Sequence, residues 1–276
     1  MARSNAAHTR ITPARRDLLT VRVLRRERVS PSFARVTLGG DDLRAFEPLG
    51  RDQWFRLFLP VADGSLTRLP QKLDSLAYLR YLAISKTERP VLRNYSVAGY
   101  RAEGPEGPEL DVDFVLHGSE GEATAGPAAT WAQTCTRGDA VAIFDEGVLF
   151  SASPAPDDRI ALVGDETALP AVAGILAWLP ALTQGSAVIG VPDAGDIRAL
   201  VAPPGVDVRW VVRDPGSIEG GTDLLRAATE AGIPPTYGWV AGEQSLVTAM
   251  RRHWVRLGVS KKAVSFTGYW RAPRAH

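Results

Sequence analysis

The periodicity of apolar residues changes once along this chain of 276 residues, at residues 151–158. Before this point, apolar and polar residues alternate in short segments, which is typical of antiparallel strands with one buried face. After it, apolar strand-like segments alternate with helical ones, which is typical of a parallel sheet covered by helices. We therefore predict two domains, over residues 18–150 and 159–276, joined by a linker at 151–158 that is rich in proline, serine and acid.

Six segments of the first domain predict strands, and turn residues lie between them: 19–23, 34–38, 55–59, 94–98, 110–116 and 140–144. Six short strands of this kind predict a small antiparallel β-barrel. Residues 73–84 lack the two-residue period and predict a short helical insert. A lid or a partner surface is an open alternative for this insert, and covering one end of the barrel is the role that we favour.

The second domain predicts strands at 159–163, 187–191, 206–212, 237–241 and 263–267, and helices at 171–179, 223–231 and 244–257. Ligands of open parallel sheets bind at the carboxyl ends of the strands. Two predicted loops lie there, at 164–167 and 241–243. The first strand-to-helix turn has the single glycine Gly164, so the glycine-rich fingerprint of dinucleotide-binding folds is not supported.

Composition excludes several classes of protein. A formal net charge of +1 argues against a protein built to bind nucleic acid, and no apolar run approaches the roughly 20 residues that span a bilayer. The single cysteine, Cys135, excludes disulfides within the chain and fits a reducing compartment. No residues have metal-site spacing. We expect a cytoplasmic monomer without a permanent metal.

Residues 1–28 carry eight arginines against two acids. An arm that attracts an anionic partner is one interpretation, and a solvated terminus that runs into an exposed strand is the one we favour. We predict a flexible basic arm over residues 1–17.

The segment Arg93-Asn94-Tyr95-Ser96 has the side chains that hold a flavin on an extended strand. An arginine pairs with phosphate, a tyrosine ring stacks on the isoalloxazine, and a hydroxyl reaches the hydrogen-bonding edge of the ring. We predict that Tyr95 and Ser96 are the catalytic positions. Residues 126–131 predict a glycine turn that enters a helix, whose first amide groups suit a pyrophosphate.

Strand 110–116 has one face that is too polar for a core, with Asp111, Asp113 and Val115 leading to His117. We interpret this face as a ligand contact. His117 itself fits a proton donor or ligand contact as well as it fits a hydrogen-bonded structural histidine.

Three further groups have two interpretations each. Thr167 fits a helix N-cap, and a capped helix still presents amides to a phosphate. Tyr269 and Trp270 fit a core position or, beside Arg271, a flavin face or an anion site. For Arg251, Arg252 and Arg256 we favour a solvated helix face. Ser96 and Ser245 lack the context of a hydrolase nucleophile.

Several motifs, taken in order over roughly residues 18–271, resemble the siderophore-interacting proteins, which are ferric-siderophore reductases of the ferredoxin–NADP reductase superfamily. The matching motifs are residues 93–96, 111–118, 126–128, 131–132, 164–171, 239–243 and 268–271. The resemblance implies an FAD-binding barrel followed by an NAD(P)H-binding α/β domain. It also implies hydride transfer from NADH or NADPH to FAD and single-electron transfer to ferric iron, with release of Fe(II).

The resemblance implies roles for particular residues. Those that would hold FAD are Arg93, Tyr95, Ser96, Asp113, Val115 and His117, with Gly126, Ala128, Ala129 and Thr130 at the pyrophosphate. Those that would meet the nicotinamide nucleotide are Asp165, Glu166, Thr167, Gly242 and Glu243, with Trp270 also at a cofactor. Arg56 and Arg271 would collect an anionic ferric siderophore.

The chain departs from the family pattern at Ser96, where threonine is common, at Ala98, where a second arginine is common, and at Arg56, where lysine is common. Two other functions stay open: a general NAD(P)H–flavin or ferredoxin-type reductase, and a flavin-loaded siderophore carrier without turnover.

Overall fold

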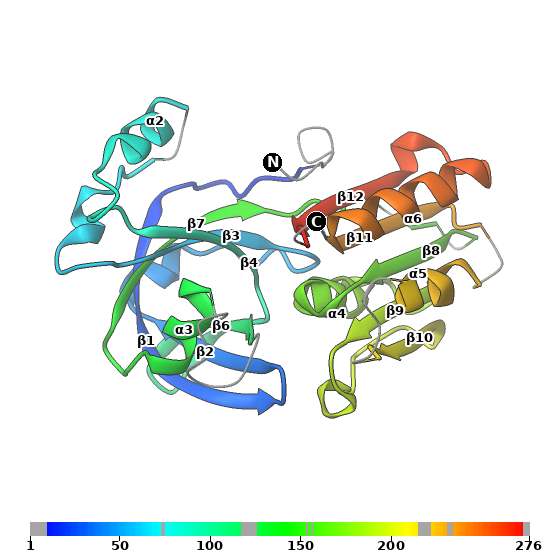
Figure 1. The fold of residues 1–276 in the computed structure, drawn as a ribbon, viewed down its shortest axis with the longest axis horizontal. Helices are drawn as coiled ribbons and strands as arrows, with labels where there is room; N and C mark the ends of the chain where they lie inside the picture. The colour runs from blue at the N-terminus through cyan, green and yellow to red at the C-terminus, as the bar shows by residue number, and fades with distance from the viewer. Residues whose placement is uncertain are drawn as a thin grey trace. The chain divides into compact units, whose positions relative to one another are not determined.

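The computed structural model describes residues 10–72, 75–116, 126–152, 154–155, 157–214, 222–230 and 234–272. The chain divides into two compact units. The barrel unit comprises Thr12–Leu49 and Gln53–Gly147. The α/β unit comprises Gly50–Asp52 and Val148–His276, with the described N-terminal residues up to Ile11. Figure 1 shows both units.

Within the described residues, the barrel unit is an antiparallel sheet of seven strands in the order β4-β3-β7-β1-β2-β6-β5. Their bounds are β1 Leu18–Ser30, β2 Phe33–Gly39, β3 Trp54–Leu59, β4 Val91–Ser96, β5 Gly99–Gly104, β6 Gly107–Val115 and β7 Ala140–Gly147. The two edge strands, β4 and β5, are consecutive in the chain, and the amide of Ala98 between them donates to the Asp111 carbonyl at 2.9 Å. Strand β4 also contacts β6, the neighbour of β5, so the two ends of the sheet come together, which confirms the predicted antiparallel barrel.

The prediction of six barrel strands missed β5. This strand begins and ends with glycine and has no alternation of apolar residues. Arg101 on β5 forms ion pairs with Glu109 and Asp111 of the neighbouring β6, at 2.7 and 2.6 Å. Polar cross-strand pairs thus hold the strand at the sheet edge, where an apolar pattern is not needed.

Two helices pack on different sides of the barrel sheet. Helix α3, Pro127–Thr134, buries Ala128, Ala129 and Ala132 in the barrel core. Helix α2, Ser75–Ala83, confirms the predicted helical insert. Its Tyr81 packs with Phe58 of β3 and Phe144 of β7. Neighbours of these two residues along each strand point into the barrel core, so Phe58 and Phe144 point to the opposite face. The expectation that the insert covers one end of the barrel was therefore wrong: α2 lies on the outer face of the sheet.

The α/β unit has a parallel sheet of five described strands in the order β10-β9-β8-β11-β12, as predicted. The strands are β8 Arg159–Gly164, β9 Gln184–Val191, β10 Gly205–Val212, β11 Tyr237–Glu243 and β12 Val264–Trp270. The helices are α4 Leu169–Trp178, α5 Thr222–Thr229 and α6 Gln244–Arg256. Helices α5 and α6 bury Leu224, Met250 and Trp254 against the sheet. All neighbouring strands of this sheet are parallel, so their carboxyl ends lie at the same edge.

Short 3₁₀ helices complete the described secondary structure: Asp41–Ala45, Ser65–Arg68, Glu166–Ala168, Ala194–Asp196 and Lys261–Ala263. No helix of the described residues is long and apolar enough to cross a membrane.

Candidate functional site

Arg93 and Tyr95 lie on one face of the edge strand β4. They pair across the ladder with Leu57 and Phe55, which are both buried in the barrel core. Alternation therefore points Arg93 and Tyr95 to the same side, and helix α3 packs against β4 on this side of the sheet. The two segments that predict flavin binding, 93–96 and 126–131, are brought together in the barrel unit.

The rings of this face form a continuous contact. Tyr95 lies 4.4 Å from Phe114, and Phe114 lies 5.7 Å from Trp131 on α3, measured between ring centroids. Burial raises the pKa of Tyr95, so its hydroxyl stays protonated at physiological pH. Ser96, in contrast, pairs with Trp54 and is buried on the opposite face of the strand. Its predicted contact with a flavin stays a prediction.

The first turn of α3 has the features of an anion site. Pro127 occupies its first position, and the amides of Ala128 and Ala129 have no acceptor inside the helix. Their side chains are buried in the core, so only their backbones are available to a ligand. The amide of Thr130 donates to the Gly126 carbonyl at 3.1 Å and is already used.

FAD fits these residues. The Arg93 guanidinium is exposed and donates to its neighbour's carbonyl, Leu92 O, at 2.8 Å, which leaves most of its donor groups for a phosphate. The free amides of α3 supply a second set of phosphate donors on the same side of the sheet.

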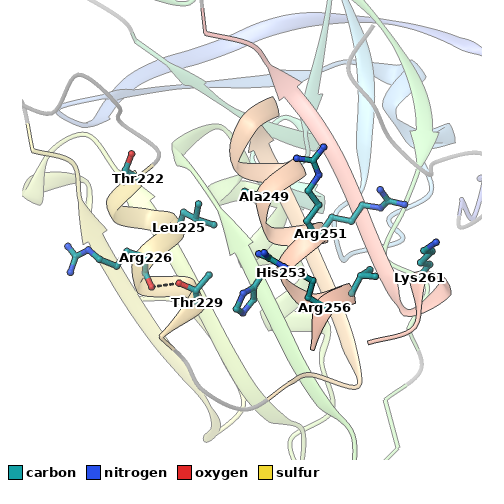
Figure 2. A pocket seen from close by; sticks show the side chains of 11 residues that line it. Thr222, Leu225, Arg226, Thr229, Ala249, Arg251, His253, Arg256 and Lys261 are labelled. Carbon is teal, nitrogen blue, oxygen red and sulfur yellow. Dashed lines mark hydrogen bonds between the residues drawn. The ribbon is translucent and has the colours of Figure 1, made fainter. Parts of the chain in front are cut away.

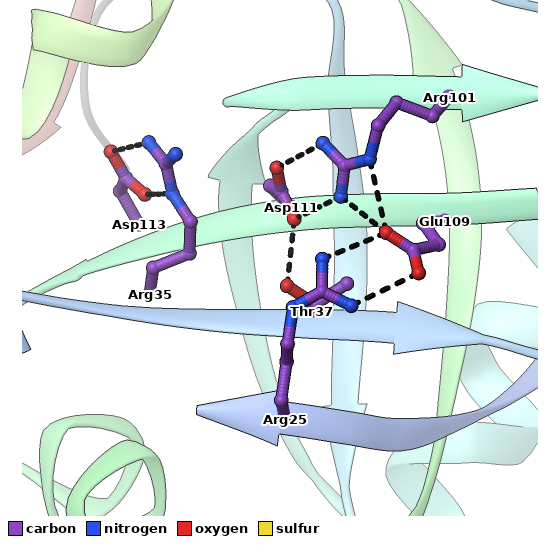
Figure 3. A network of polar contacts seen from close by, with 7 residues as sticks. All are labelled: Arg25, Arg35, Thr37, Arg101, Glu109, Asp111 and Asp113. Carbon is purple, nitrogen blue, oxygen red and sulfur yellow. Dashed lines mark hydrogen bonds and ion pairs between the residues drawn. The ribbon is translucent and has the colours of Figure 1, made fainter. Parts of the chain in front are cut away.

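The polar face of β6 is satisfied by the protein itself (Figure 3). Asp113 accepts two hydrogen bonds from Arg35, at 2.7 and 3.0 Å. Asp111 accepts from Thr37 at 2.8 Å and from Arg101 at 2.6 Å. The carboxylates of this face have arginine partners within the chain, so its polarity does not require a ligand.

Two further residues predicted to contact the cofactor are at or beyond the end of β6. Val115 ends β6 and is half-buried, while His117 lies outside the described residues. Cofactor contacts of Asp113, Val115 and His117 stay predictions. Arg101 does not replace the arginine that the chain lacks at Ala98, because its guanidinium is taken by Glu109 and Asp111.

The two predicted substrate arginines differ in their surroundings. Arg56 on β3 forms an ion pair with the buried Glu146 at 2.6 Å and lies over the Tyr78 ring at 5.9 Å. Arg16 binds the other oxygen of Glu146 at 3.0 Å, which holds this part of the predicted flexible arm. Arg271 follows β12 and is exposed.

At the carboxyl edge of the parallel sheet, one carboxylate joins most of the predicted residues. Asp165, directly after β8, is buried. Its Oδ2 accepts from the amide of Glu243 at 2.6 Å and from the indole Nε1 of Trp270 at 2.8 Å. Its Oδ1 accepts from the Thr167 amide at 2.9 Å and from the Thr167 hydroxyl. Burial, together with the charge of Glu166, raises the pKa of Asp165 to about 6.

The backbone at this edge is adapted to that carboxylate. Gly242 has a φ of 131°, and a Cβ at this position would lie 2.4 Å from Asp165 Oδ2. In the pairing of β11 with β12, Gly242 faces Gly268 but Glu243 faces Trp270, so Tyr269 is an extra residue. Such a bulge changes the direction of the following side chain. The residue after this bulge, Trp270, donates its indole N–H to Asp165.

Two acids beside Asp165 have other partners. Glu166 is fully buried and forms an ion pair with Arg213 at 2.6 Å. The Glu243 carboxylate caps α6 by accepting from the amides of Ser245 and Leu246. The N-cap of the 3₁₀ helix is Asp165 and not Thr167, which corrects the prediction of a Thr167 cap.

Sequence reasoning missed Arg213 and the shared role of Asp165. Arg213 lies just beyond β10, far from residue 166 in the chain, and no local pattern indicates its partner. The signal for Asp165 was its position after a buried strand, followed by a threonine two residues later, as in a side-chain cap.

A separate cavity of about 790 Å³ lies over α5 and α6 (Figure 2). The helix arginines expected to be solvated line it, together with Arg226, His253 and Lys261. Arg251 also stacks over the Phe266 ring at 4.7 Å. None of the predicted site residues lines this cavity. Among the described residues, no group of three or more metal-binding side chains is present.

Comparison with known proteins supplies the family. Residues 22–149 match the model of the siderophore-interacting FAD-binding domain, and residues 157–273 match that of the siderophore-interacting protein. The ferric vibriobactin reductase ViuB of Vibrio cholerae is 30% identical, over 83% of this chain and 80% of that protein. An NADPH-dependent ferric-chelate reductase of Escherichia coli is 26% identical, over 91% of each chain.

A solved structure agrees. The crystal structure of a siderophore utilization protein from T. fusca matches with a TM-score of 0.74 and 26% identity, over 97% of each chain. The chain belongs to the siderophore-interacting protein family, and residues 22–149 are its FAD-binding domain.

Proposed function

We propose that this protein is an FAD-dependent oxidoreductase that passes electrons from NAD(P)H to a ferric siderophore and releases the iron as Fe(II). The observation that carries the proposal is the common face of Arg93, Tyr95 and the first turn of α3, inside the segment that matches the family's FAD-binding domain. The reductase names of the Vibrio cholerae and Escherichia coli relatives support the reaction.

Each residue of the barrel face has a definite task in this proposal. Arg93 and the amides of Ala128 and Ala129 bind the phosphates of FAD. Tyr95 covers one side of the ring system, and its contact with Phe114 keeps its ring in place. FAD, when bound, accepts a hydride from a nicotinamide and gives up electrons one at a time. Contacts from Ser96, Asp113, Val115, His117, Gly126 and Thr130 belong to the same proposal.

The carboxyl edge of the α/β sheet binds the nicotinamide nucleotide in this proposal. Because Gly242 has no side chain, the backbone at the end of β11 lies close to the Asp165 carboxylate. The hydrogen bond from the Glu243 amide to Asp165 joins this backbone to the turn after β8. We assign the FAD-binding domain to residues 18–150 and the NAD(P)H-binding domain to 159–276, with 151–158 as the linker. The similarity to the NADPH-dependent ferric-chelate reductase of Escherichia coli favours NADPH as donor.

Arg56 and Arg271 collect the anionic ferric siderophore in this proposal. Exposed charges are screened over about 10 Å at 0.1 M salt, so capture weakens as salt rises. The double variant Arg56→Ala, Arg271→Ala raises the KM for an anionic ferric siderophore and flattens its salt dependence. Steady-state rates at several salt concentrations test this, and an unchanged KM and salt slope would remove both arginines from the site.

An anaerobic titration tests the whole proposal. The purified protein is yellow, is bleached by NADH or NADPH without air, and regains its absorbance when a ferric siderophore is added but not when oxidised ferredoxin is added. Failure to bleach would favour a flavin-loaded carrier. Reoxidation by ferredoxin would favour a general reductase with a protein partner.

The compartment and the assembly are further parts of the proposal. A single cysteine, Cys135, which is buried, fits the reducing cytoplasm. We place the protein there as a monomer, and size-exclusion chromatography with light scattering tests the assembly.

A further inference from the structure

The hydrogen-bonding capacity of Asp165 is fully used within the protein. An ionised carboxylate offers about four lone-pair positions. Four donors occupy them: the Thr167 amide and hydroxyl on one oxygen, and the Glu243 amide and the Trp270 indole on the other. The side chain is also buried. A bound nucleotide therefore has neither an open lone pair nor a path to this carboxylate, and Asp165 does not act by touching it.

The four donors come from three separate chain segments that end at the same sheet edge. Thr167 opens the 3₁₀ helix after β8, Glu243 begins the turn from β11 into α6, and Trp270 ends β12. We propose that Asp165 is a positioning residue that holds the Trp270 indole and the Gly242–Glu243 turn in the arrangement that binds the nicotinamide nucleotide. This inference rests on the proposed function of the same edge.

Charge and packing make this arrangement specific to a small, buried carboxylate. Three charged groups are next to Asp165 or to the residues that donate to it: Glu166, which is paired with Arg213, Glu243, whose carboxylate accepts from the α6 amides, and Arg271, which follows Trp270. Within the part of the chain that the structure describes, the donors to Asp165 are backbone amides, a hydroxyl and an indole, so neutral groups stabilise its charge. Loss of one of these donors therefore leaves a buried charge with fewer hydrogen bonds and no cation to stabilise it.

The α/β unit contains a matched control. Asp52 is also buried, and its carboxylate accepts from the indole Nε1 of Trp239 at 2.9 Å and from the amides of Leu149 and Phe150 at 3.0 and 2.9 Å. Burial raises its pKa as well. Trp239 precedes the carboxyl end of β11, and the residues that Asp52 binds carry no predicted contact to the cofactor. Asp52→Asn therefore reproduces the loss of an aspartate–tryptophan bond away from the proposed site.

The first arm of the test needs no cofactor. The indole N–H resonances of Trp270 and Trp239 are assigned by NMR with the variants Trp270→Phe and Trp239→Phe. In Asp165→Asn we expect the Trp270 resonance to shift and its exchange with solvent to accelerate about ten-fold, as for one lost hydrogen bond of ordinary strength. The Trp239 resonance should stay in place, and Asp52→Asn should give the converse. An unmoved Trp270 resonance in Asp165→Asn overturns the proposal.

The second arm measures the KM for NADH and NADPH in the FAD-loaded protein. Asp165→Asn and Trp270→Phe should each raise the better donor's KM about ten-fold, the equivalent of one ordinary hydrogen bond, while Asp52→Asn leaves it near wild type. An equal rise in Asp52→Asn, or an unchanged KM in the folded Asp165→Asn and Trp270→Phe variants, overturns the positioning role. If neither nucleotide reduces the wild-type protein, the proposed function is wrong. The NMR measurement of the indole N–H resonances still decides, independently of that result, whether Asp165 holds Trp270.

Discussion

Two groups of buried carboxylates, one in each unit, are stabilised in opposite ways. In the barrel unit, Glu109 is bound by Arg25 at 2.8 Å and by Arg101 at 2.7 Å (Figure 3). The hydrogen bond from Arg25, with that from Arg101, lowers the pKa of Glu109 to about 2. At the edge of the α/β sheet, Asp165 is bound by neutral donors, and burial raises its pKa to about 6.

The difference suggests different roles: Glu109 stabilises the fold, whereas Asp165 belongs to the proposed nucleotide site. Arginine partners compensate the charge of Glu109, and their guanidinium groups reach solvent, so the network costs little to keep ionised. Asp165 keeps its charge at neutral pH only through hydrogen bonds that also fix a glycine turn and a terminal tryptophan. A pKa raised by burial, as for Asp165, is common at functional sites, whereas ion-pair networks such as that of Glu109 also shift pKa values for structural reasons.

The largest effect is expected from a substitution that fills the space around the Asp165 carboxylate. Gly242→Ala places a Cβ 2.4 Å from Asp165 Oδ2, whereas Gly258→Ala, also at a positive φ of 92°, meets nothing within 4 Å. Backbone strain of about 1–3 kcal/mol is common to both variants. We expect Gly242→Ala to lose more stability than Gly258→Ala and to lose NAD(P)H binding as well. Urea unfolding and flavin bleaching measure the two effects, and equal losses in both variants would contradict the close fit.

A second prediction concerns a cation outside the barrel network. Arg93→Ala should weaken FAD binding by about 1.5–3 kcal/mol, or one to two decades in affinity, because a charge-assisted phosphate contact is lost. Arg22→Ala is the control, since Arg22 is also exposed and also donates to a carbonyl, that of Gly138. Flavin fluorescence on titration of the apoprotein measures the affinity. Equal affinities in both variants would remove Arg93 from the FAD site.

A third prediction tests the structural carboxylate. Glu109→Gln removes the charge that joins Arg25 to Arg101 and should destabilise the protein by about 1–2 kcal/mol, because both arginines keep partial access to water. The midpoint of urea unfolding measures the change. FAD affinity and the KM for NAD(P)H should stay at wild-type values; a selective loss of either would place the network in the functional site.

The smallest effect is in the pH dependence of stability, and its sign differs between the two carboxylates. The pKa of Glu109 is lowered by folding, so its contribution is present above about 4.5 and is lost as pH falls towards 2. The pKa of Asp165 is raised, so its contribution is present below about 3.8 and is lost as pH rises through about 6. Thermal midpoints of wild type relative to Asp165→Asn should therefore rise from pH 7 to pH 5. A flat difference would show that Asp165 does not titrate in this window.

Most of the fold follows from the sequence, because alternation and helical periodicity record which faces are buried. All five strands and three helices predicted for the α/β domain are present, and the barrel strands differ mainly at their ends. The exception, β5, has no apolar period, and its Arg101 pairs with Glu109 and Asp111 on the next strand. Ion pairs between neighbouring strands leave no apolar pattern in the sequence.

Three features can be predicted from periodicity and from the direction of parallel strands: the two units, the strand that carries Arg93 and Tyr95, and the sheet edge to which Asp165, Gly242 and Trp270 belong. Which groups bond to one another is visible only in the folded protein. There Asp111 and Asp113 have arginine partners, and Asp165 accepts from Trp270, 105 residues later. The physical reason is that hydrogen bonds and ion pairs depend on distances of a few ångströms between segments far apart in the chain, which no local pattern specifies.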